Sequence, residues 1–80
     1  MAEGYTFHYG VKDIFLLDVT SIVYEKCVAD GVITIPAVDE YRAKNIFDID
    51  PVPCVQKFIY VTEPDGTETE FDAYTDVIIR

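Results

Sequence analysis

Apolar and polar side chains alternate along several short stretches of the chain, which is the two-residue period of a β-strand. The clearest stretches are Tyr5–Gly10, Val55–Val61 and Thr67–Tyr74. Between the last two, Glu63–Gly66 reads E-P-D-G and predicts a tight turn, because proline presets φ and glycine accepts the left-handed conformation. The alternation therefore predicts an antiparallel hairpin near the C-terminus, with the acidic side chains of its second strand facing water.

Three further stretches are apolar without a clear alternation. Ile14–Val19 is too apolar for a strand with one wet face, so we expect it to lie centrally in a sheet. Val32–Ile35 predicts a strand that Pro36 ends, and Val77–Ile79 predicts a short strand close to the C-terminus.

Asp39–Asn45 carries the best local helix signal. Asp39 can cap the first turn with its carboxylate, and Glu40 precedes Lys44 by four residues in the favoured orientation. A helix of about two turns is marginal by itself, so we expect tertiary packing to hold it.

The segment Ser21–Ala29 fits two interpretations. In the first it is a helix that Thr20 or Ser21 caps and that ends at Asp30-Gly31. In the second, Val23–Val28 is a strand that turns at the same Asp30-Gly31 into the next strand, because its β-branched residues favour extended backbone.

The stretch Ile46–Val61 organises the rest of the chain, since it joins a proline-bracketed turn to the most convincing strand. Asp50–Pro53 must be extended, because each proline pushes its predecessor out of the α region. Pro51 and Pro53 also lack backbone donors, so this segment cannot lie inside a sheet.

Together these elements predict a mainly β fold with an α+β tendency. We expect residues 1–80 to form a single small antiparallel β domain of five or six strands with one or two short helices. Half of the residues are apolar, including six tyrosines and five phenylalanines. This is more apolar surface than 80 residues easily bury, so some of it must stay exposed or meet a partner.

The net charge of −9 limits the kinds of partner that the chain can bind. Six scattered Lys and Arg residues are too few to neutralise phosphates, which argues against nucleic acid and against anionic membranes. The N-terminus has no signal-peptide pattern and no apolar run reaches a membrane span, so we expect a cytoplasmic location. Cys27 and Cys54 both sit beside valine, which indicates ordinary buried thiols rather than a disulfide or zinc site.

Short motifs occur in a recognisable order along the chain: Tyr9-Gly10, Asp18–Thr20, Asp30-Gly31, Asp50-Pro51 and Lys57–Val61. In this order they resemble a small β-rich module, the C-terminal domain of unknown function in a subfamily of J-domain co-chaperones, and similar modules in bacterial proteins. The chain departs from that pattern, because Cys54 stands where the module has a glycine. The resemblance implies a fold type and no activity.

No residue pattern predicts a catalytic group, a metal site or a cofactor. Asp48 and Asp50 flank Ile49, so in an extended segment both carboxylates would point the same way and could hold a cation. Solvated turn carboxylates are the stronger interpretation. His8, the one histidine, is expected to be half-exposed on the face of its strand opposite the aromatic residues.

The leading hypothesis is a non-enzymatic interaction or assembly module that binds protein, either itself as a homodimer or larger assembly, or another chain. The alternatives are a small ligand-binding module for a sugar or a cation, and an acidic regulator or inhibitor that engages a basic protein. Tyrosine is enriched at interfaces because its ring offers rigid amphipathic contact area. The candidate contact residues are aromatic and acidic side chains of the strands and the central turn: Tyr5, Tyr9, Phe47, Asp48, Asp50 and Tyr60.

Overall fold

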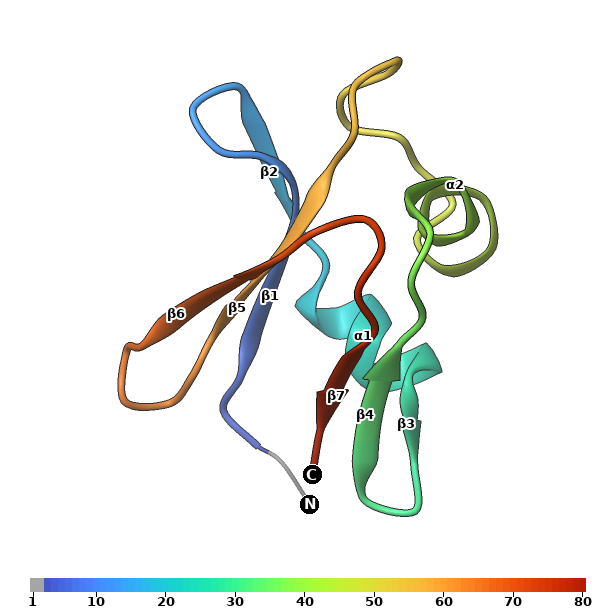
Figure 1. Cartoon of the computed structure of the whole chain (residues 1–80). Coiled ribbons are helices and arrows are strands. Elements are labelled where there is room, and N and C mark those ends of the chain that lie inside the picture. The colour runs from blue at the N-terminus through green and yellow to red at the C-terminus, as the bar shows by residue number, and fades with distance from the viewer. Residues whose placement is uncertain (1–2) are drawn as a thin grey trace.

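The computed structural model of the chain describes residues 3–80 and places seven strands in two antiparallel sheets (Figure 1). The four-stranded sheet has the order β2-β1-β5-β6, with bounds Phe15–Asp18, Thr6–Val11, Phe58–Thr62 and Glu68–Phe71. The three-stranded sheet has the order β3-β4-β7, with bounds Val28–Ala29, Val32–Ile35 and Val77–Ile79. Helix α1 spans Thr20–Lys26, and α2 (Asp39–Tyr41) continues directly into the π-helical segment η1 (Arg42–Ile46).

The predicted class, a small, mainly β antiparallel fold with one or two short helices, is confirmed. Beyond the five or six strands expected, the structure adds the two-residue β3. The predicted turn at Glu63–Gly66 is also confirmed, with Gly66 at φ 95° and the backbone N–H of Glu63 donating to the carbonyl of Thr67.

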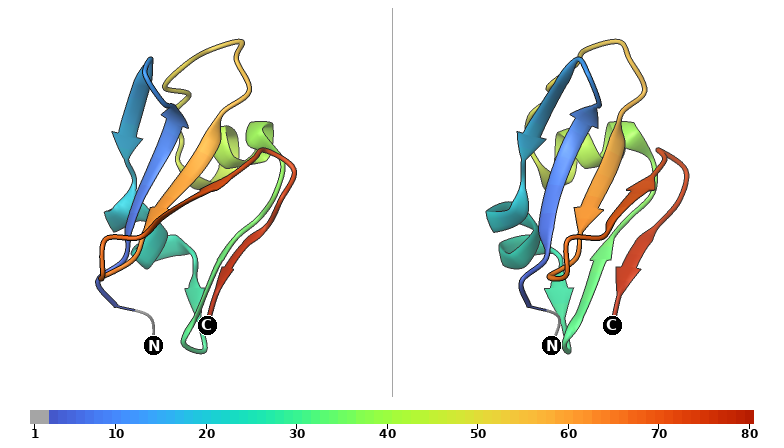
Figure 2. Two further views of the ribbon diagram at one scale, coloured as in Figure 1. Left: turned by 60° about the vertical axis from the view of Figure 1, so that its left-hand side comes forward. Right: turned by 90° about the vertical axis from the view of Figure 1, so that its left-hand side faces the viewer.

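The core lies on one face of β1 and β5. Phe7 and Tyr9 are fully buried there, as the alternation in β1 predicts. Figure 2 shows α1 and the three-stranded sheet on the same side of the four-stranded sheet, where Val23, Ile33 and Ile35 complete the core. Each such side chain contributes about 1.5–3 kcal/mol when fully removed from water.

The segment Ser21–Ala29 combines both interpretations. The helix is confirmed as α1, but it ends at Lys26, and β3 then pairs with β4. Asp30 and Gly31 have φ of 53° and 77°, which is the conformation of a two-residue hairpin turn rather than a helix stop. The predicted hydroxyl cap is wrong, because the Thr20 hydroxyl accepts from the backbone N–H of Phe7 instead.

The prediction that Ile14–Val19 lies centrally is wrong. This segment forms β2, which is an edge strand that pairs only with β1 in the described chain. Ile14 and Phe15 lie at the hairpin end, beyond the cover of α1, and are 64% and 51% exposed. This apolar run therefore forms an exposed edge strand of the sheet and not a buried central strand.

Two predicted strands are shorter than the alternation suggested. β5 begins only at Phe58, because Cys54 adopts φ 64° and the backbone N–H of Lys57 donates to the carboxylate of Asp39. β6 ends at Phe71, because the carboxylate of Asp72 accepts from the backbone N–H of Tyr74 and closes a turn.

Candidate functional site

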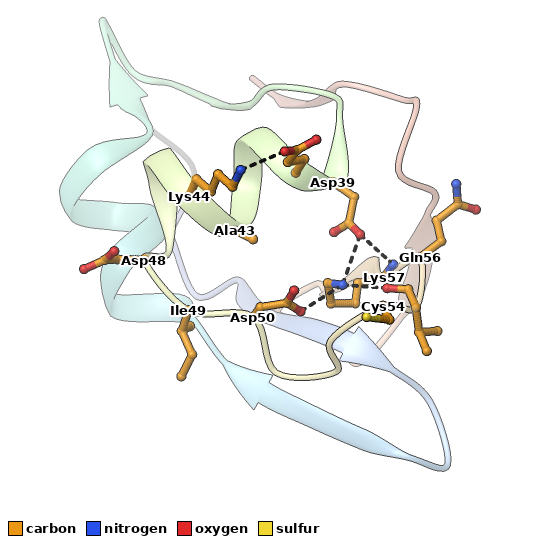
Figure 3. A pocket seen from close by; sticks show the side chains of 11 residues that line it. Asp39, Ala43, Lys44, Asp48, Ile49, Asp50, Cys54, Gln56 and Lys57 are labelled. Atoms are coloured by element: carbon orange, nitrogen blue, oxygen red, sulfur yellow. Dashed lines mark hydrogen bonds and ion pairs between the residues drawn. The ribbon is translucent and has the colours of Figure 1, made fainter.

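An open cavity of about 570 Å³ lies between the α2–η1 helix and the segment 48–57, which connects η1 to β5 (Figure 3). The predicted helix is confirmed here, and the exposed Glu40–Lys44 pair lies on it at 2.8 Å. The wall of the cavity mixes acidic, basic, amide, thiol and aliphatic side chains: Asp39, Glu40, Ala43, Lys44, Asp48, Ile49, Asp50, Cys54, Val55, Gln56 and Lys57.

Lys57 lies at the bottom of this cavity and is only 3% exposed. Its ammonium lies 2.9 Å from Oδ1 of Asp50 and 3.2 Å from Oδ2 of Asp39. It also donates to the carbonyl oxygens of Val52, at 3.1 Å, and Val55. A single buried cation therefore holds the segment 48–57 against the helix, with its charge compensated by two carboxylates.

Asp39 connects this cation to the core. The Tyr9 hydroxyl and the backbone N–H of Lys57 both donate to its carboxylate. The predicted role of Asp39 as a helix cap is wrong, since its oxygens are committed to these donors and none of them caps α2. The result is a chain of contacts from Tyr9 on β1 through Asp39 to Lys57.

Two groups of this network, Tyr9 and Lys57, have raised pKa values. Burial raises the pKa of the Tyr9 hydroxyl, and the hydrogen bond to Asp39 raises it further. Burial by itself would lower the pKa of Lys57, but the hydrogen bonds and charges of Asp50 and Asp39 outweigh it, so the pKa of Lys57 is raised. A lysine that acts as a nucleophile needs a lowered pKa, so this arrangement favours a structural cation.

This network predicts that stability falls at alkaline pH. The Tyr9 hydroxyl has a folded pKa above its unfolded value of 10.0, so its contribution is complete below pH 10 and is lost as the pH rises toward the folded pKa. Above pH 10 the unfolded chain releases the Tyr9 hydroxyl proton and the folded chain keeps it. This difference lowers the free energy of unfolding by about 1.4 kcal/mol at about pH 11. Urea unfolding between about pH 8 and 11 should show this loss. Tyr9→Phe should flatten the pH dependence, whereas Tyr41→Phe, at an exposed tyrosine, should leave it unchanged. An unchanged slope in Tyr9→Phe would contradict the assignment.

Asp48 and Asp50 do not point the same way, so that prediction is wrong. Figure 3 shows Asp50 directed toward Lys57 and Asp48 directed away from it. The reason is that Asp48 adopts φ 54°, which breaks the extended backbone that the prediction assumed. Within residues 3–80, no group of three or more His, Cys, Asp or Glu side chains is arranged to hold a metal ion.

The aromatic residues predicted to lie on a contact surface differ in how deeply they are buried. Tyr9, Phe47 and Tyr60 are 0%, 4% and 3% exposed, so their rings belong to the interior and not to a contact surface. Tyr9 and Phe47 pack with ring centroids 4.6 Å apart. Tyr5 is half-buried, and its backbone N–H donates to the Tyr24 hydroxyl.

Both cysteines are free thiols, but only one prediction about them is right. Cys27 is buried in the core, as predicted. Cys54 is exposed on the cavity wall, because its left-handed backbone turns it away from the core. His8 is half-buried on β1, directly opposite Asp18 of β2, in agreement with the prediction.

Arg42 is a structural residue that the sequence pattern did not reveal. It is fully buried, and its guanidinium donates to the carbonyl oxygens of Pro36 (2.7 Å), Asp72 (3.0 Å) and Thr75 (2.6 Å). Burial lowers its pKa from the usual value, which nearby acidic groups partly oppose. The fork of Arg42 therefore ties η1 to the loops before α2 and after β6.

The outer edge of β2 is the other candidate site. The hydrogen bonds between β1 and β2 show which residues of β2 direct their backbone groups to this edge. The backbone N–H of Val19 donates to the carbonyl of Phe7, and successive residues of an antiparallel strand point their backbone groups to opposite sides. Phe15 and Leu17 therefore face β1. Leu16 and Asp18 direct their N–H and C=O groups to the outer edge, where no strand of the described chain pairs with them.

Comparison of the chain with protein-family models, with curated proteins and with solved structures gave no match. Among the helices of residues 3–80, none is long and apolar enough to cross a membrane.

Proposed function

We propose that the chain is a non-enzymatic interaction module that binds an extended strand at the outer edge of β2. The observation that carries this proposal is an unpaired strand edge beside exposed Ile14 and Phe15. Main-chain hydrogen bonds supply affinity in strand addition, and alternating side chains supply specificity. Large exposed apolar groups at such an edge mark interaction sites.

The opposite edge of the same sheet, formed by β6, is less suited to bind a strand, which supports β2 as the binding edge. β6 presents exposed Glu68 and Glu70, and charges on an edge strand are a device against unwanted pairing. β2 carries one exposed charge, Asp18 at its end, and its other three residues, Phe15–Leu17, are apolar. The edges of the smaller sheet belong to β3 and β7, which are only two and three residues long.

The alternatives find less support. The cavity cation Lys57 is engaged by four acceptors, and the carboxylates of Asp48 and Asp50 diverge, which disfavours a ligand or cation at the central turn. An acidic regulator would use β6, and its binding to a basic partner would weaken with added salt. Strand addition at β2 depends on apolar contact and should not weaken in this way.

A peptide titration tests the proposal. The partners would be capped, uncharged peptides with alternating valine and threonine residues, followed by NMR of the amide groups of the chain. We expect changes confined to β2 and the adjoining β1, and loss of binding in Leu16→Pro. Leu16 suits this change because its N–H points to the open edge, so proline removes the binding donor without removing a bond to β1. Changes centred on β6, or none at all, would refute the proposal.

A further inference from the structure

We infer that the strand bound at this edge is β2 of a second copy of the chain, which rests on the proposed function. Two copies would pair antiparallel about a two-fold axis and join their four-stranded sheets into one. A two-fold interface uses the same patch twice, so the patch must be complementary to itself. The edge of β2 meets this condition, because it offers both donors and acceptors and carries apolar side chains.

Charge selects the second copy over another occupant. A basic partner would be drawn to the acidic β6 edge, whereas β2 presents an uncharged apolar run at Phe15–Leu17. Each copy carries a net charge of −9, so only an edge free of acidic side chains at its centre allows two copies to approach. β2 of a second copy matches this edge, because it presents the same apolar run and its one charge, Asp18, lies at its end.

The direction of the backbone groups in β2 determines the register in which the two β2 strands pair. The outward-facing groups of Leu16 allow it to pair with Leu16 of the second copy and to exchange both hydrogen bonds. Phe15 then lies opposite Leu17 of the second copy, which covers the 51% exposed ring. The two Asp18 carboxylates lie at opposite ends of the paired strands in this register, which separates like charges. A register centred on Leu17 would bring them closer together.

Disulfide trapping tests this register. In a Cys54→Ser background, Leu16→Cys would place two thiols on directly opposed residues about 5.5 Å apart at Cα, within the range of a disulfide. We expect oxidation to give mainly a covalent dimer. The matched control, Thr69→Cys on the β6 edge, should stay mainly monomeric. Equal and low dimer yields from both variants would overturn the inference.

Light scattering supplies a test without cysteines. The mass of the unmodified chain should rise with concentration from 9.1 kDa toward twice that value, and more steeply at high salt because salt screens the repulsion. Leu16→Pro should stay at 9.1 kDa.

Should that variant fail to fold, Leu16→Lys places a charge on the same edge and should give the same mass. A wild-type monomer up to about 1 mM, where association is worth only about 4 kcal/mol, would refute self-pairing. If peptides still bind β2 in that case, the proposed function stands and only the second copy is excluded.

Discussion

Replacing Arg42 with methionine is expected to lower the free energy of unfolding by about 3–5 kcal/mol. Methionine fills part of the volume but donates no hydrogen bond, so the carbonyls of Pro36, Asp72 and Thr75 lose their partner. Each buried polar group that loses its partner costs about 1–3 kcal/mol. A chain of 80 residues has a total stability of about 4–12 kcal/mol, so this variant should lose a large part of its stability.

Urea unfolding followed by circular dichroism measures this loss, and two variants control for it. Arg42→Lys keeps the charge but cannot span three carbonyls with a planar fork, so its loss should be smaller and still clear. Lys44→Met removes an exposed cation from the same helical segment and should change stability little. A change below about 1 kcal/mol in Arg42→Met would show that the carbonyls find water instead.

Replacing Lys57 with methionine should cost about 2–4 kcal/mol and loosen the segment 48–57. The variant leaves Asp39, whose side chain is 17% exposed, without its cation, whereas the 42% exposed Asp50 can turn to water. It also releases the carbonyls of Val52 and Val55. Amide hydrogen exchange should therefore accelerate in this segment more than in β1.

A double-mutant cycle separates the ion pair from simple loss of packing. Asp39→Asn removes the buried charge, so Lys57→Met should cost less in that background than in the unmodified chain. Lys12→Met provides the matched control, because the Lys12–Glu68 pair is exposed and its loss should leave the exchange of segment 48–57 unchanged. Strictly additive losses in the cycle would contradict the coupling between Asp39 and Lys57.

The sequence pattern predicted the local elements well, because their signals are local. Alternation predicted β1, the proline and glycine of Glu63–Gly66 predicted the turn, and charge spacing predicted the helix at Asp39–Asn45. The pattern failed where the outcome depends on partners distant in sequence. An apolar run such as Ile14–Val19 looks the same whether a second strand covers it or leaves it at an edge.

The buried polar groups show the same limit. Arg42 and Lys57 are ordinary charged residues in the sequence, and partners from other parts of the chain bury them only once the chain has folded. Arg42 donates to two carbonyls 30 and 33 residues away, and Lys57 contacts Asp39, 18 residues away. Positive φ at Asp48 and Cys54 is also invisible to a pattern of residue types, since neither is glycine. The conformation of Asp48 explains why the carboxylates of Asp48 and Asp50 diverge, and that of Cys54 explains why β5 begins late.

The central claim is that the outer edge of β2 accepts a strand, and the amide signals of Leu16 and Asp18 test it most directly. These two N–H groups point to the open edge, so an added strand must change them before any others in the sheet. We predict that the peptide titration shifts both signals and protects them from hydrogen exchange, and that Leu16→Pro removes the effect at Asp18. Signals at Leu16 and Asp18 that stay unchanged and unprotected at saturating peptide would contradict the account.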